Sequence, residues 1–346
     1  MKRLLKIILA YSHNFLITMY LKKIFNNKRI IVTGHTGFKG SWLTAWLKLL
    51  GANIMGISLN LPTQPSHFFV SKISSGIKDI RLDIRNRTKL EKKIILFKPD
   101  FIFHMAAQPL VRYSYQEPKY TYEVNVLGTL NLLEAVRVNQ LQTIVVNITT
   151  DKCYENKEWD RGYRENEPMG GHDPYSSSKA CSELITQAYR ESYFSIQATG
   201  SSRISLCSVR AGNIIGGGDW AKYRLVPDCI RAFEKGEKLK IRYPRAVRPW
   251  QHVLDVISGL LLLSEKVFRN DHSHCQAWNI GPDSIVFIDD TPMELDEVKT
   301  EHKEVETILF PTGDEAACHD LLKRLRGLFG KQVISDEGLI RAVSFR

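Results

Sequence analysis

The residue types with the most chemical meaning in this chain are the run Thr150-Asp151-Lys152 and the pair Tyr175 and Lys179. The Tyr-x-x-x-Lys spacing places a phenol and an amine one helical turn apart, and a nearby ammonium lowers the pKa of a phenol. A deprotonated tyrosine is a base, so this pair indicates removal of a proton from an alcohol. The carboxylic acid and second amine of the run add proton-transfer groups that alcohol oxidation alone does not need. This surplus indicates a reaction that also eliminates water.

A glycine run near the start of the chain predicts a binding site for a dinucleotide. Gly34, Gly37 and Gly40 follow a β-branched run and open an amphipathic segment, which is the setting of a dinucleotide fingerprint. Gly34 permits the tight turn, Gly37 lets the backbone approach a pyrophosphate, and Gly40 allows close packing of the helix. The N-terminus of that helix favours the phosphate charge.

The ends of the second and third expected strands indicate which dinucleotide binds. Asn60 stands where a ribose-binding carboxylate is usual, and no arginine directly follows it to bind a 2′-phosphate. NAD is therefore preferred over NADP. Asp83 is placed to accept a hydrogen bond from the adenine amine, and its alternative role is that of a helix N-cap.

Strand-like and helix-like runs alternate along the chain. This predicts a Rossmann-type, doubly wound parallel sheet with helices on both faces and a smaller C-terminal substrate-binding domain. Strands are expected at 28–33, 52–58, 80–84, 101–105, 143–149 and 204–209. Helices are expected at 41–50, 87–97, 117–139, 175–193, 225–235 and 256–266. The predicted domains are a basic N-terminal extension (1–27), the dinucleotide-binding domain (28–212), a nucleotide-sugar-binding domain (213–282) and a divergent tail (283–346).

The remaining composition favours an enzyme that acts on small molecules in the cytoplasm. The six cysteines lack Cys-x-x-Cys spacing, which indicates neither a zinc site nor a redox dithiol and suits a reducing compartment. His104, His172 and His252 lack the mutual spacing of ligands, so no metal is expected. The net charge is +11, but no basic stripe with aromatic platforms indicates a nucleic-acid partner. The apolar run at 4–10 is too short to span a bilayer, and a surface anchor is its alternative.

Several stretches resemble the extended short-chain dehydrogenase/reductase family, and within it the CDP-glucose 4,6-dehydratases. The resemblance covers about 28–282, and its most specific parts are Thr150-Asp151-Lys152 and the Arg-Pro-Trp-Gln-His run that starts at Arg248. The related dTDP-glucose dehydratases have Glu where Lys152 stands, and the epimerases lack the Asp-Lys pair. The matching stretches are 32–42, 104–112, 150–154, 174–179, 210–213, 217–220 and 247–253.

The resemblance implies a lyase that converts CDP-glucose to CDP-4-keto-6-deoxyglucose by internal hydride transfer through bound NAD. It implies Tyr175 as the base at the sugar 4-hydroxyl and Thr150 as a hydrogen-bond partner of that oxygen. Lys179 holds the ribose, and Asp151 is the acid at C6. Lys152 is the hypothesised base at C5, which requires burial near Lys179 to keep its amine neutral.

The resemblance also implies the residues that contact the ligands, and a homodimer built through the helices at 117–139 and 175–193. The expected cofactor contacts are Gly34, Thr36, Gly37, Phe38, Gly40, Asn60, Asp83, Ile84, Ala106, Ala107, Gln108, Asn125, Tyr175 and Lys179. The expected substrate contacts are Gln108, Asn213, Trp220, Arg224, Arg242 and Arg248.

Two alternatives stay open at this point. A nucleotide-sugar epimerase of the same fold shares most of these residues, although Asp151 has no task in epimerisation. After Pro282 the family's closing segments are not matched, so an inactive NAD-binding protein is the second alternative.

Overall fold

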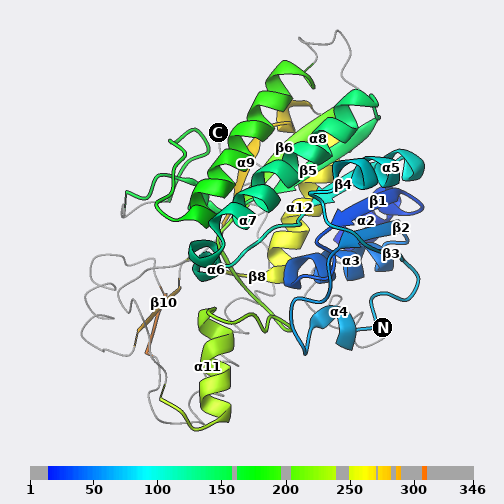
Figure 1. Cartoon of the computed structure of the whole chain (residues 1–346). Coiled ribbons are helices and arrows are strands. Elements are labelled where there is room, and N and C mark those ends of the chain that lie inside the picture. Colours follow the sequence, from blue (N-terminus) through cyan, green and yellow to red (C-terminus); the bar gives the residue numbers. More distant parts are fainter. Residues whose placement is uncertain are drawn as a thin grey trace.

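The computed structural model describes residues 15–157, 162–195, 204–238, 249–269, 272–281, 286–289 and 306–309. Its centre is a seven-stranded parallel sheet with the order β3-β2-β1-β4-β5-β6-β9 (Figure 1). This confirms the predicted doubly wound α/β fold, with an added edge strand and a third strand that begins and ends earlier than expected. The strands are β1 Arg29–Thr33, β2 Asn53–Ser58, β3 Lys78–Arg81, β4 Phe101–His104, β5 Thr143–Ile148, β6 Ile204–Ala211 and β9 Ala277–Ile280.

Helices cover both faces of the sheet, and each strand contributes side chains to both cores. In β1, Ile30 and Val32 pack into one core while Ile31 packs into the other, because successive side chains of a strand point to opposite faces. Such continuous apolar strands are expected where a parallel sheet is buried on both sides. One core contains α2 (Phe15–Phe25), α3 (Phe38–Leu49) and α12 (Val253–Phe268), and the other contains α5 (Arg87–Phe97), α8 (Gly128–Val138) and α9 (Pro174–Ser192).

The order of the strands reverses at β1, whose neighbours are β2 on one side and β4 on the other. Gly34 follows β1 and Met105 follows β4, and the N–H of Met105 donates to the carbonyl of Thr33 at 3.2 Å. Ligands of open parallel sheets bind outside the carboxyl ends of the strands at such a reversal. The glycine run therefore lies at the edge of the sheet where a ligand is expected to bind.

The range predicted as an N-terminal extension (1–27) contains the helix α2, at residues 15–25. Leu21 and Phe25 are fully buried in the core shared with α12, and the hydroxyl of Tyr20 donates to Glu265 of that helix. The apolar face of α2 thus belongs to the fold. The first part of the extension, 1–14, lies outside the described residues.

Two elements within the range predicted as the smaller domain (213–282) pack in the central layers. The expected helix at 256–266 is α12, whose Val253 and Ile257 lie in the core that contains α3, and β9 pairs with β6. The strands β7 (Asn213–Ile215) and β8 (Trp250–His252) pair with each other outside the main sheet. Figure 1 shows α11 (Leu225–Glu234) apart from the sheet layers. The domain boundaries stay predictions.

The helix expected at 117–139 contains a π-helical segment. The region of the expected helix follows the short helix α6 (Val111–Gln116). It consists of α7 (Pro118–Tyr122), the π segment η1 (Glu123–Leu127) and α8. A π segment is an irregularity of the hydrogen-bond ladder that often lies at a functional site. Here it contains Asn125, which is 1% exposed.

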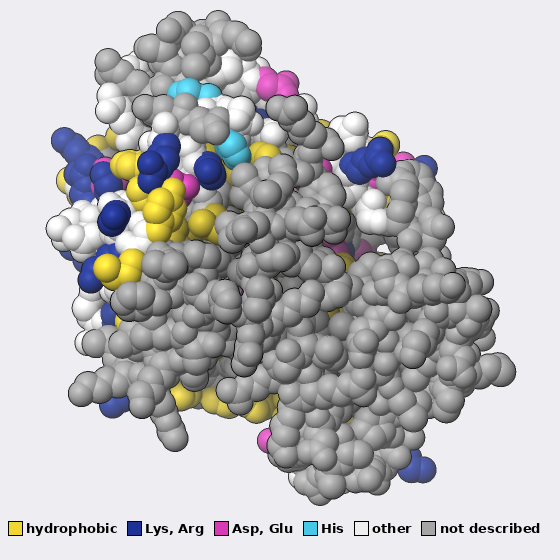
Figure 2. All heavy atoms as spheres, turned by 180° about the vertical axis from the view of Figure 1, so that it is seen from behind, with side chains coloured by type: hydrophobic (Ala, Val, Ile, Leu, Met, Phe, Trp, Pro, Cys, Tyr) yellow, Lys and Arg dark blue, Asp and Glu magenta, His cyan; other side chains and the backbone are white. Residues whose placement is uncertain are grey.

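The outlying segments add little to the site. The segment between β2 and β3 contains the short helix α4 (His67–Val70), and the predicted tail contains the parallel pair β10 (Val286–Asp289) and β11 (Glu306–Leu309). Within the described ranges, no helix combines the length and apolar character needed to cross a membrane. Figure 2 shows the molecule from behind, with the described Lys and Arg side chains spread among hydrophobic and acidic ones.

Candidate active site

Helix α9 begins where its sequence provides a cap. The Asp173 carboxylate accepts from the N–H of Ser176 at 3.0 Å, and Pro174 occupies the first helical turn, as is common at helix starts. Tyr175 lies in the same turn, and its N–H donates to the hydroxyl of Ser114 in α6 at 3.1 Å. The cap and this contact place the phenol at the carboxyl edge of the sheet.

Thr150 connects the predicted base to the predicted acid. Two residues beyond β5, it caps the 3₁₀ turn η2 (Asp151–Cys153) and accepts from the N–H of Lys152 at 3.4 Å. Its hydroxyl donates to Asp151 Oδ1 at 3.0 Å and is also hydrogen-bonded to Tyr175. A hydroxyl has one proton, so Thr150 donates to one of these partners at a time. Segments that are distant in sequence therefore meet at this side chain.

The surroundings of Tyr175 bear on the electrostatic part of the prediction. Burial raises the pKa of Tyr175 to about 12, against the lowering effects of the Thr150 hydrogen bond and the Arg224 charge. Lys179, expected to supply that lowering effect, instead donates to the carbonyl of Ile148 at 3.2 Å. Burial also lowers the pKa of the Lys179 amine to about 8. Desolvation opposes the charged form of both groups. Burial therefore disfavours the phenolate, and the role of Lys179 in keeping the phenol deprotonated stays a prediction.

Lys152 lies beside Asp151 but is not deeply buried. Its amine is 3.9 Å from Asp151 Oδ1 and donates to Asn213 Oδ1 at 3.2 Å. The Lys152 side chain is 33% exposed, whereas Lys179 is 6% exposed. The burial that the C5-base hypothesis invokes is therefore found at Lys179 and not at Lys152.

The turn between β1 and α3 fits a dinucleotide pyrophosphate. Gly34 has a φ of +73°, and a Cβ there would lie 2.7 Å from the nitrogen of Ala106. A Cβ at Gly40 would lie 2.2 Å from the carbonyl oxygen of Gly34, so glycine is required for this close approach. Gly37 is the N-cap of α3, which begins at Phe38. The helix N-terminus therefore has no capping side chain to compete with a phosphate.

Residues predicted to contact the rest of the cofactor lie around this turn. The Thr36 hydroxyl is 2.7 Å from that of Ser58, and Asn60 is exposed after β2. The Asp83 carboxylate accepts from Arg85 Nη2 at 2.7 Å. The alternative role of Asp83 as an N-cap is wrong, because Asn86 caps α5. The proposed contacts of Asn60, Asp83, Ile84, Ala106 and Ala107 with the cofactor stay predictions.

Gln108 and Asn125 are buried and hydrogen-bonded to each other. The Asn125 amide accepts from the N–H of Gln108 at 2.8 Å and donates to its carbonyl at 3.1 Å and to Ser178 of α9 at 2.9 Å. The Gln108 side chain donates to Thr121 at 2.9 Å and accepts from the N–H of Leu110. The π segment thus fixes the loop after β4 against α9. Ligand contacts by these two side chains stay predictions.

The predicted substrate contacts are only partly within the described residues. Asn213 opens β7, and the Trp220 carbonyl accepts from Arg231 at 3.1 Å. Arg224 donates to Asp219 at 2.7 Å, and its side chain is 32% exposed. A guanidinium has further donors that remain for a diphosphate. Arg242 and Arg248 lie outside the described residues.

Lys39 is a residue near the site that the sequence analysis misses. It lies in the first turn of α3, where its amine is influenced by the charges of Lys179, Arg224, Asp151 and Asp219. Burial first, and then the two cations, lowers the pKa of Lys39 to about 7. The sequence signal that could have found Lys39 is its place inside the glycine run, because a dinucleotide fingerprint requires no charged residue there.

The three histidines considered as metal ligands lie apart and have separate surroundings. His104 is buried between Thr33 (2.8 Å) and Thr129 (3.1 Å), and burial lowers its pKa to about 3. His252 caps α12, and His172 is exposed. Among the described residues, no three His, Cys, Asp or Glu side chains are grouped to hold a metal ion.

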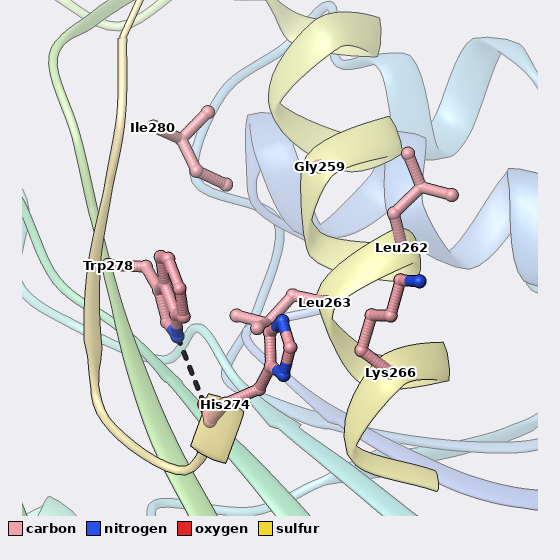
Figure 3. A pocket seen from close by; sticks show the side chains of 7 residues that line it. All are labelled: Gly259, Leu262, Leu263, Lys266, His274, Trp278 and Ile280. Atoms are coloured by element: carbon pink, nitrogen blue, oxygen red, sulfur yellow. Dashed lines mark hydrogen bonds between the residues drawn. The ribbon is translucent and has the colours of Figure 1, made fainter. Parts of the chain in front are cut away.

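A separate apolar pocket lies at the outer edge of the sheet, between α12 and β9 (Figure 3). In it the indole of Trp278 donates to the carbonyl of His274 at 3.0 Å. None of the predicted site residues lines this pocket. Its lining consists of Gly259, Leu262, Leu263, Lys266, His274, Trp278 and Ile280.

Comparison with known proteins points to one family. Residues 30–281 match the model of the NAD dependent epimerase/dehydratase family. The chain is 50% identical to the CDP-glucose 4,6-dehydratase of Salmonella typhimurium over 261 residues, which are 75% of this chain and 73% of that protein. It is 33% identical to the GDP-mannose 4,6-dehydratase of Yersinia enterocolitica over 181 residues, 48% of this chain and 46% of that protein.

A solved structure shows the same fold. DesIV, the dTDP-glucose 4,6-dehydratase of Streptomyces venezuelae with NAD and TYD bound, matches with a TM-score of 0.63 and 24% identity. The match covers 91% of this chain and 95% of that chain.

The Thr150 hydrogen bond predicts a pH effect. Since this bond lowers the pKa of Tyr175, Thr150→Val raises it, and a base with a raised pKa is active only at higher pH. A hydrogen bond to a charged group contributes about 1.5–3 kcal/mol, which corresponds to about one to two pH units. We expect the acidic limb of the kcat profile to move up by that amount, with a loss of about 10- to 100-fold at pH 7. Thr143→Val, at the opposite end of β5, is the matched control, and an unmoved limb in folded Thr150→Val contradicts the assignment.

Proposed function

Because the chain belongs to the NAD dependent epimerase/dehydratase family, we propose that it dehydrates CDP-glucose to CDP-4-keto-6-deoxyglucose. The observation that carries this proposal is the meeting of Tyr175 and Asp151 at the Thr150 hydroxyl. One group is suited to removing a proton from an alcohol and the other to donating a proton to a leaving hydroxyl. The 50% identity to a CDP-glucose 4,6-dehydratase supports the choice of sugar and nucleotide.

We propose that the turn of Gly34, Gly37 and Gly40 holds the pyrophosphate of NAD and that Lys179 holds the adjoining ribose. When bound, NAD supplies a hydride acceptor for C4 of the sugar and afterwards a hydride donor for C6. The buried position of Lys179 supports its role, because an amine desolvated at the carboxyl edge of β5 binds ribose hydroxyls without competition from water.

Tyr175 begins the reaction by taking the proton of the sugar 4-hydroxyl. Burial disfavours its phenolate, and the Thr150 hydrogen bond and the Arg224 charge favour it. Thr150 therefore has two tasks, which are to support the phenolate and to orient the oxygen that is being oxidised. Its hydroxyl serves them in turn, because it donates one hydrogen bond at a time.

Asp151 and Lys152 serve the elimination that follows. The new 4-ketone acidifies the hydrogen at C5; a base removes this proton while an acid protonates the hydroxyl that leaves C6 as water. C5 and C6 are bonded neighbours, so the two groups must lie close together. The separation of 3.9 Å between the Lys152 amine and Asp151 Oδ1 supports this pairing.

We propose that the nucleotide sugar lies between this edge and the segment from Asn213 to Arg224. Arg224 supports binding of the diphosphate, because a guanidinium can donate two parallel hydrogen bonds to phosphate oxygens. Asn213 already accepts a hydrogen bond from Lys152, which links the substrate side to the catalytic turn.

We also propose a homodimer, formed through α9 and the helix that contains η1. Two large apolar side chains on these elements face outward, with Leu184 53% exposed and Leu127 49% exposed. Apolar side chains gathered on paired helices are suited to a four-helix contact between two copies. The cytoplasm remains the proposed location.

The function is tested by incubating the protein with CDP-glucose and NAD and measuring the absorbance of a 4-keto sugar in alkali. We expect a keto product with CDP-glucose. Asp151→Asn should lower its rate by about 10²- to 10⁴-fold, the usual contribution of a general acid. UDP-glucose and GDP-mannose are the matched controls. A galactose product would indicate an epimerase, and no product at all would indicate an NAD-binding protein without this activity.

The role of Lys152 is tested by solvent exchange. In D₂O the wild type should incorporate deuterium at C5 of the product, and Lys152→Ala should lose this exchange while it still oxidises C4. Lys157→Ala is the control, because Lys157 pairs with Glu155 on the same segment at 2.8 Å. Retained exchange in Lys152→Ala would refute this residue as the base.

The dimer is tested by sedimentation. Leu184→Glu places a charge in the proposed contact and should raise the dissociation constant by at least about 10-fold. Leu96→Glu is the matched control, because Leu96 is 71% exposed on α5, outside the proposed contact. Two variants that sediment alike would contradict the assignment of this surface.

A further inference from the structure

Glu183 is a carboxylate buried directly behind the proposed active site. It lies one helical turn after Lys179 in α9 and is 3% exposed. Its oxygens accept from Arg210 Nη2 at 2.9 Å, from the hydroxyl of Ser208 at 2.8 Å and from the hydroxyl of Thr149. These three contacts fix the position of the carboxylate behind the site.

Arg210, the partner of this carboxylate, is itself fixed from other directions. Its guanidinium donates to the Tyr154 hydroxyl at 2.6 Å and to the carbonyl of Glu165 at 2.9 Å, and it lies over the Tyr154 ring at 5.0 Å. Arg210 is 5% exposed, and arginine keeps its proton in proteins. Glu183 is the acidic member of this buried pair, and it lies on the helix of Lys179.

Several other charged or titratable groups face this pair. Arg190 lies further along α9, and Cys153 and Tyr154 come from the segment after β5. Burial raises the pKa of both the Cys153 thiol and the Tyr154 phenol, so neither supplies a second negative charge at neutral pH. Glu183 is thus the nearby carboxylate that compensates a charge on Lys179.

Lys179 needs this compensation because its other neighbours do not provide it. The charges of Lys39 and Lys179 oppose each other, and His104 is neutral because burial lowers its pKa to about 3. Burial lowers the pKa of Lys179 to about 8, and Glu183 is the largest influence that raises it. Without the carboxylate, the amine would therefore lose its proton at a lower pH.

We propose that Glu183 is a positioning residue that keeps the Lys179 amine protonated and sets the place of Thr150. The second effect follows from Thr149, which precedes Thr150, donates its hydroxyl to Glu183 and donates its N–H to Val209 at 2.7 Å. One carboxylate thus ties α9 to the end of β5. The effect on the reaction rests on the proposed dehydratase function, whereas the effect on the Lys179 charge does not depend on activity.

The test compares Glu183→Gln with Glu183→Asp by NMR titration of the protein labelled with ¹³C at the lysine ε-carbons. The Lys179 signal is assigned from its loss in Lys179→Arg. We expect Lys179 of the wild type to titrate near pH 8 and that of Glu183→Gln to titrate about one unit lower. Glu183→Asp keeps the charge and should stay near the wild type.

A purely structural role would lower the melting temperature of Glu183→Gln and leave the Lys179 titration unmoved, which overturns the proposal. If Glu183→Gln does not fold, the double variant Glu183→Met with Arg210→Met removes both buried charges and keeps their volume. The Lys179 titration of this folded variant should also move down, and an unmoved titration overturns the proposal. A wild type without activity on CDP-glucose, together with a moved titration, would contradict the proposed function and leave this inference standing.

Discussion

The packing of α9 on the end of β5 is the constraint on which the proposed active site depends. Buried hydrogen bonds set it, since the Asn147 amide donates to Ser182 at 3.1 Å and to Thr186 at 2.8 Å, and Thr149 donates to Glu183. Apolar contacts allow a helix to slide, whereas hydrogen bonds are directional, and a buried polar group left without its partner costs stability. The network therefore selects one register of helix against strand. That register brings the phenol of the helix and the acid of the turn after the strand to a shared hydroxyl.

The same burial determines the electrostatics of the site. It raises the pKa of Tyr175 to about 12 and lowers those of Lys179 and Lys39 to about 8 and about 7. Burial favours the neutral form of each group, so its charge depends on the few charged or hydrogen-bonding residues around it. In a medium of low dielectric these single contacts have large effects. A dehydratase transfers several protons on one sugar. Groups whose charge changes readily are suited to this task.

Much of the fold could be predicted because its signals are local. Alternating apolar strands and amphipathic helices indicated a parallel sheet, and α5 was expected with the ends it has, Arg87–Phe97. Long-range packing could not be predicted in the same way. α2 lies in the range of the predicted extension and α12 in that of the predicted second domain, and both fill the core beside α3. A hydrophobic face shows that a helix is buried, but it does not show against which surface. The π segment η1 escaped prediction because it follows from the contacts of Asn125 across the chain.

The sequence by itself determined which groups are available for chemistry. The spacing of Tyr175 and Lys179 is one helical turn, and the glycines of the first turn admit a phosphate wherever the rest of the chain lies. Only the tertiary structure decided how these groups are charged, because a pKa depends on burial and on neighbours from distant segments. Arg210 of β6 reaches Glu183 of α9, and the pKa of Tyr175 is lowered by Thr150 and Arg224, which are distant from it in sequence. Spacing along the chain determines which chemical groups are present and which lie within reach of each other. Desolvation and charge pairing arise only when the folded chain excludes water.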